Sequence, residues 1–138
     1  MSEPLIVDAN PLMSTLLGGR AEKITSSGAF KLYSTQFTLF EVAKYIPRLA
    51  EKLGSTELEL FAAFEELPVV ACQPSEYADR EGEAAALIGA RDERDVPLLA
   101  PALTRGYSVW SDDRDFEGIA EIQLYKTSDL IAQLFEKS

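Results

Sequence analysis

Apolar runs of strand length alternate along this chain with longer segments whose apolar residues recur at helical spacing. Strands separated by helices need crossover connections, and such connections produce a parallel sheet with helices on both faces. The order therefore predicts an α/β fold, a three-layer α/β/α sandwich with a central parallel five-stranded sheet. We expect one domain over residues 1–138, with strands in the segments PLIVDAN (4–10), FKLYS (30–34), VVAC (69–72), YSVWS (107–111) and IQLYK (122–126).

The helical segments between these strands carry recognisable start signals and one irregularity. Asn10 is expected to cap the first helix, which ends before residue 18. Pro101 lies inside the helix expected over residues 95–105, where a proline forfeits a hydrogen bond and costs about 3 kcal/mol. That helix therefore either bends at Pro101 or begins later than Asp95. The remaining helices are expected at residues 20–27, 38–52, 56–66, 80–92 and 127–137.

The composition excludes several classes of site. The chain has no histidine and a single cysteine, Cys72, so it cannot assemble the usual zinc ligand sets or a Ser-His-Asp or Cys-His nucleophile system. Its 23 acidic residues outnumber 13 basic ones, and the net charge of -10 argues against a broad basic face for nucleic acid. The first residues resemble neither a signal peptide nor a membrane span, so a cytoplasmic protein is expected.

Acidic residues gather at one edge of the expected sheet. Asp8 follows the first strand, and Asp113 and Asp115 follow the fourth. Glu41 lies in the first turn of the helix after the second strand, and Asp95 begins the helix that leads into the fourth. Open parallel sheets bind ligands beyond the carboxyl ends of their strands, where the chain order reverses. The five carboxylates are therefore expected to converge there.

Carboxylates that converge need a partner, because like charges raise one another's pKa and destabilise the fold. A divalent cation removes this conflict, and Mg²⁺ and Mn²⁺ favour oxygen ligands while keeping several waters. Such an ion polarises a phosphoryl oxygen and neutralises a leaving oxyanion, as phosphodiester hydrolysis requires. The competing interpretation is that the acids of SDDRDFEG, residues 111–118, only mark a solvated loop.

Four segments resemble, in order, the acidic motifs of the PIN domain family: IVDAN, FTLFEV, DVPLLAPAL and VWSDDRDF. PIN domains are metal-dependent ribonucleases, and many are the toxin of a prokaryotic toxin–antitoxin pair. The resemblance implies RNA as substrate, Mg²⁺ or Mn²⁺ as cofactor and an antitoxin as partner. Many family members have a further acid, and Asp115 matches it. Asp112 falls at a position where the family varies, and it is interpreted as an outer-shell or solvent-facing residue. The family's acidic quartet corresponds to Asp8, Glu41, Asp95 and Asp113.

This resemblance also implies roles for the acids. Asp8, Asp95 and Asp113 would hold the ion, directly or through water. Asp115 would complete the shell or help a second ion, and Glu41 would position the attacking water.

Basic residues beside the acids allow two interpretations. Lys44, Arg48 and Lys52 recur every four residues on one helix, and they either hold an RNA backbone or form the solvated face of that helix. A second group flanks acidic positions and either contacts phosphate or pairs with those acids. This group contains Arg91, Arg94 and Arg114.

Five further residues also allow a functional and a structural interpretation. Trp110 lies in an expected buried strand, so core packing is favoured over base stacking. Ser34 and Ser111 end strands and either orient carboxylates or take part in ordinary turns. Asp92 and Glu93 are expected to be helix-end and loop charges rather than metal ligands.

The leading hypothesis is a Mg²⁺- or Mn²⁺-dependent endoribonuclease of the PIN type. The alternative is a non-catalytic PIN-fold interaction module that binds a protein or RNA partner. A phosphoacceptor receiver domain fits poorly, because Cys72 and Gln73 stand where an acid would be needed. Subtracting five site acids from 23 leaves 18 against 13 basic residues, so RNA would bind locally or at a surface completed by a homo-oligomer.

Overall fold

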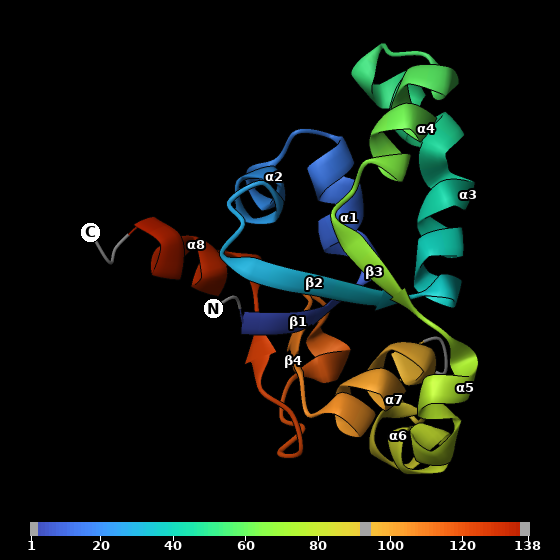
Figure 1. Ribbon diagram of the computed structural model, residues 1–138, viewed down its shortest axis with the longest axis vertical. Helices are drawn as coiled ribbons and strands as arrows, with labels where there is room; N and C mark the ends of the chain where they lie inside the picture. Colours follow the sequence, from blue (N-terminus) through green and yellow to red (C-terminus); the bar gives the residue numbers. More distant parts are fainter. Residues whose placement is uncertain (1–2, 92–94, 136–138) are drawn as a thin grey trace.

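A five-stranded parallel sheet forms the centre of the molecule (Figure 1). The computed structural model describes residues 3–91 and 95–135. The strand order is β3-β2-β1-β4-β5, and every neighbouring pair is parallel. The predicted parallel sheet is confirmed, with strands β1 (Glu3–Val7), β2 (Phe30–Thr35), β3 (Val69–Cys72), β4 (Ser108–Trp110) and β5 (Leu124–Tyr125).

Helices cover both faces of this sheet and complete the predicted three layers (Figure 1). The layer on one face consists of α1 (Ala9–Leu16), α2 (Arg20–Thr25), α3 (Gln36–Leu53), α4 (Glu57–Glu65) and α8 (Thr127–Phe135). The other layer consists of α5 (Pro74–Tyr77), α6 (Glu81–Ile88) and α7 (Val96–Arg105), with the 3-10 turns η1 (Ala78–Arg80) and η3 (Arg114–Phe116) nearby. Within the described residues, no helix is long and apolar enough to cross a membrane.

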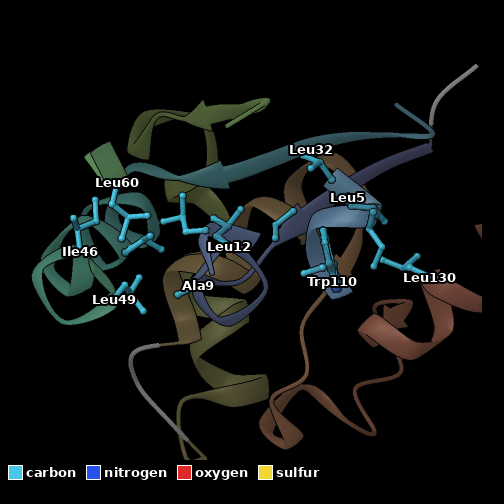
Figure 2. Close-up of a cluster of buried hydrophobic side chains, with 14 of the residues drawn as sticks. Leu5, Ala9, Leu12, Leu32, Ile46, Leu49, Leu60, Trp110 and Leu130 are labelled. Atoms are coloured by element: carbon cyan, nitrogen blue, oxygen red, sulfur yellow. The ribbon is translucent and has the colours of Figure 1, made fainter. Parts of the chain in front are cut away.

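Two apolar clusters, one on each side of the sheet, hold the layers together. Side chains alternate along a strand, so Leu5 and Val7 of β1 enter one cluster while Ile6 enters the other. Figure 2 shows the first cluster, in which the fully buried Trp110 lies among leucines from several elements. The Trp110 indole Nε1–H donates to Thr127 Oγ1 over 3.1 Å, so its one polar group is also satisfied. Trp110 is therefore a core residue, as expected.

Helix boundaries differ from expectation in places that bear on the site. The residue that caps α1 is Asp8, which accepts a hydrogen bond from Ala9 N, and Asn10 lies inside the helix. The prediction of an Asn10 cap is wrong because the first strand ends earlier than the sequence pattern indicated. The helix α7 begins at Val96, one residue after Asp95, and contains Pro101. The long α3 also contains an interior proline, Pro47.

Candidate metal centre

The acidic site lies where the chain order of the sheet reverses. From β1 the chain continues outward through β2 and β3, and then returns to place β4 on the other side of β1. The backbone N–H of Asp8 donates to Trp110 O over 3.0 Å, which joins the ends of β1 and β4. This pairing brings the residues that follow each strand to the same crevice. Asp8 and Asp113 therefore meet although they are far apart in the sequence.

Three carboxylates converge in this crevice. Asp8, Asp95 and Asp113 each offer an oxygen, and these oxygens lie within 4.8 Å of one another. Asp8 and Asp95 both occupy the N-cap positions of helices, α1 and α7, where the helix dipole favours negative charge. Asp95 is buried, with an exposed fraction of 8%. The spacing suits oxygen ligands around one hard divalent cation better than it suits three neighbouring negative charges alone.

The Asp8 carboxylate is held in a fixed orientation. Its Oδ1 accepts from Ala9 N over 2.8 Å, and its Oδ2 accepts from the Ser111 hydroxyl over 2.7 Å. Burial raises the pKa of Asp8 above its ordinary value, and the charges of Asp113 and Glu41 add to this increase, while the two hydrogen bonds oppose it. Without a counter-ion, this carboxylate is therefore less easily ionised than a free one. A cation bound among the three acids would relieve that penalty.

Ser111 connects the two strand ends through its hydroxyl. It donates to Asp8 and accepts from the backbone N–H of Asp113 over 3.0 Å. Asp113 Oδ1 in turn accepts from Asp115 N over 2.9 Å, as the N-cap of η3. The structure thus favours the carboxylate-orienting interpretation of Ser111. Ser34 does not play this part, because its hydroxyl donates to the backbone oxygen of Val7 over 2.7 Å.

The three acids open into a pocket of about 380 Å³. Glu41 contributes to its wall from α3, together with the neighbouring Thr38 and Tyr45. The Thr38 hydroxyl accepts from Thr35 Oγ1 over 2.9 Å, which fixes it in this buried position. The remaining lining residues are Asp8, Ala9, Asn10, Met13, Asp95, Leu98 and Asp113. All four acids of the predicted quartet therefore face one cavity.

Asp115 and Asp112 lie outside this group of three carboxylates. Asp115 contributes its backbone N–H to Asp113, and its side chain is neither in the three-acid group nor among the residues that line the pocket. Asp112 turns the other way: its two oxygens accept from Thr127 N over 2.8 Å and from Thr127 Oγ1 over 2.7 Å. Asp112 thus fixes the start of α8. Asp112 is exposed, in agreement with the solvent-facing interpretation, but it also has a defined partner, Thr127, which that interpretation did not include.

The basic residues flanking the site take several positions. Arg91 Nη1 donates to the backbone oxygens of Asp115 and Glu117, so within the described ranges it braces the loop after β4 rather than pairing with an acid. Arg114 is exposed. The hydrogen bond from Lys126 is the main cause that lowers the pKa of Glu117, and the charge of Arg114 adds to this decrease. The exposed Lys44 and Arg48 lie on α3 beside the pocket wall. The assignments for Asp92, Glu93 and Arg94 lie outside the described residues.

The sequence patterns missed three side chains of the pocket wall. These are Thr38, Tyr45 and Asn10, of which Asn10 was expected only as a helix cap. The spacing of Thr38 and Tyr45 from Glu41 on α3 offered a signal, because residues three and four apart on a helix share a face. That rule would have placed Thr38 and Tyr45 beside Glu41.

Comparison with known proteins identifies the family. The sequence profile of the PIN domain matches residues 6–132, so the chain belongs to the PIN domain family, as the motif resemblance predicted. No curated protein matches the chain in sequence.

Solved structures support the same fold. A chain from a toxin–antitoxin complex of Klebsiella pneumoniae is 18% identical, with a TM-score of 0.66 over 89% of this chain and 97% of its own length. A chain of VapBC2 from Rickettsia felis, solved bound to a promoter DNA fragment, is 9% identical, with a TM-score of 0.63 over 89% and 98%. At these identities, the similarity establishes the fold.

Proposed function

We propose that this chain is a Mg²⁺- or Mn²⁺-dependent endoribonuclease that acts in the cytoplasm as the toxin of a toxin–antitoxin pair. The observation that carries the proposal is the convergence of the Asp8, Asp95 and Asp113 carboxylates within 4.8 Å at the sheet's switch point. Family membership supports nuclease chemistry for such a group of acids. With no histidine in the chain, this chemistry rests on carboxylates and a metal.

The donor set fits a hard divalent cation. Asp8, Asp95 and Asp113 would hold it, and Ser111 would keep Asp8 in its binding orientation. When bound, the ion supplies charge stabilisation for the phosphoryl oxygens of the substrate. Glu41 faces the same pocket and would orient the attacking water and take up its proton. Asp115 would act on the site through its backbone bond to Asp113.

A protein partner follows from the same proposal. The two structural neighbours come from a toxin–antitoxin complex and from VapBC2. We propose that an antitoxin covers the acidic pocket and places a basic side chain among its carboxylates, because a cation of either kind would neutralise the repulsion there.

Cleavage of total RNA tests the function directly. The purified chain should cleave RNA with Mn²⁺ or Mg²⁺ and should stop cleaving it in EDTA. Asp113→Asn should abolish cleavage, whereas Asp79→Asn, an exposed acid in η1, should not change it. Metal-independent cleavage, or equal cleavage by the two variants, would contradict the proposal.

The same assay separates the alternative, a non-catalytic interaction module. Such a module would bind its partner with or without Asp113 and would show no metal-dependent cleavage. Retained growth inhibition by the Asp113→Asn variant in cells would favour that alternative.

A further inference from the structure

A second hollow adjoins the acidic pocket along α3. It has a volume of about 460 Å³ and is lined by Lys44, Tyr45, Pro47, Arg48 and Glu51. Tyr45 also lines the acidic pocket, so it borders both cavities. A polymeric ligand that places one phosphate at the carboxylates would therefore place its next residue beside Tyr45.

The ring of Tyr45 is available for contact and is held in place. Its side chain is 38% exposed, and the Arg48 guanidinium lies over the ring at 5.8 Å from the centroid. This cation–π contact restrains both side chains at the rim of the hollow. Aromatic rings of this kind stack unpaired nucleobases regardless of sequence, since every base has a π-face.

Two cations stand at the same rim. Lys44 and Arg48 are one helical turn apart, and Arg48 lies two turns beyond Glu41, about 10 Å along the helix axis. Within the described part of the chain, neither forms an ion pair, whereas Arg80, Arg105 and Lys126 each pair with a glutamate. Their charges are thus available to phosphate in an otherwise acidic protein. Glu51 also lines the hollow, and its carboxylate can accept hydrogen bonds from the amino groups of a base.

From these observations we propose that the hollow is a nucleotide subsite for single-stranded RNA, an inference that rests on the proposed ribonuclease function. A base next to the scissile phosphate stacks on Tyr45, and Lys44 and Arg48 hold its backbone phosphate. The subsite selects single strands, because a paired base cannot turn onto the ring. Such a subsite also allows a protein with a net negative charge to bind RNA, since the RNA is held locally rather than over a broad basic face.

Binding of a fluorescent single-stranded RNA of random sequence tests this subsite, measured by anisotropy on an Asp8→Asn background that prevents cleavage. Tyr45→Ala should weaken binding by about 5- to 150-fold, and Tyr45→Phe should restore it. Lys44→Gln with Arg48→Gln should reduce the slope of log K against log salt by about 1.4. Lys52→Gln, on the same helix outside the hollow, is the matched control and should leave both quantities close to the parent values. Binding of duplex RNA of equal length should not respond to Tyr45→Ala.

The outcomes for the subsite and for the ribonuclease are distinguishable. Unchanged affinity in Tyr45→Ala and in the double variant, or no binding by the parent, overturns the subsite. Metal-dependent cleavage by the unmodified chain is measured separately and would leave the ribonuclease proposal intact. Thermal melting of each variant identifies any loss of affinity that arises from unfolding. Because Tyr45→Phe keeps the ring, restored affinity in this variant assigns the loss in Tyr45→Ala to stacking rather than to the fold.

Discussion

The carboxylates of Asp112 and Asp113 leave the same turn after β4 toward opposite surroundings. We call these surroundings the pocket side, formed by Asp8, Asp95 and Asp113, and the helix side, formed by Asp112 and Thr127. On the helix side both oxygens of Asp112 accept hydrogen bonds from Thr127. On the pocket side the carboxylates face one another, and the pKa of Asp8 is raised by burial and by Asp113 and Glu41.

The comparison shows how one acidic loop serves two purposes. An acid that lies among donors of the protein and apart from other carboxylates, as Asp112 does, stabilises the fold. Acids that converge on one another repel even where donors orient them, as at Asp8, and a bound cation relieves that repulsion. Residue type and position in the sequence are nearly the same in the two cases. The direction of the side chain decides between them.

The largest expected effect is on the pocket side. Asp113→Asn should reduce Mn²⁺ affinity by more than about 100-fold, because changes behind the ligands already reduce metal affinity 10- to 100-fold. Isothermal titration of the metal-free chain measures this affinity. Its matched control is Asp112→Asn, one residue away, which should bind Mn²⁺ as the parent does. Equal loss in both variants would remove the distinction between the two sides.

The next effect is on the helix side. Asp112→Ala leaves the buried hydroxyl and the N–H of Thr127 without their acceptor, and should lower the free energy of unfolding by about 1–3 kcal/mol. Chemical denaturation of the metal-free chain measures this loss of stability. Asp113→Ala should destabilise less, because it also removes repulsion from Asp8. A larger loss for Asp113→Ala would contradict this assignment.

Ser111→Ala sharpens the comparison, since Ser111 touches both strand ends on the pocket side. Loss of its hydroxyl frees the Asp8 carboxylate and should reduce Mn²⁺ affinity by about 10-fold. Ser34→Ala is the control, because that buried hydroxyl bonds to Val7 O and not to a carboxylate. Both variants should lose similar stability, while only Ser111→Ala should change metal affinity in titration.

The smallest effect is a pH dependence of the metal-free chain. Because the pKa of Asp8 in the folded chain is raised above 3.8, the folded state binds this proton more tightly than the unfolded state. The associated stability is present below about pH 3.8 and is lost as pH rises through the folded pKa. Asp8→Asn should therefore gain stability relative to the parent as pH rises, in denaturation curves recorded with EDTA. A difference independent of pH would contradict the assigned shift.

Both the fold and the place of the site follow from the sequence for local reasons. The alternation of apolar strand runs with helical segments predicts a parallel sheet, because each element must bury its apolar face. The positions of Asp8 and Asp113 after two strands place them at one edge in any such sheet. Pro101 predicts an irregular helix, and α7 contains this proline and begins one residue later than expected.

Tertiary structure decided which of the acids at this edge face one another. The Asp8–Ser111 hydrogen bond joins residues 103 positions apart, and its geometry depends on the register of β1 against β4. Asp112 turns away because α8 offers it two donors at Thr127, a contact that no local pattern encodes. Tyr45 borders two cavities only because α3 packs beside the sheet edge. The sequence determined which residues reach this edge, and long-range packing determined where their side chains point.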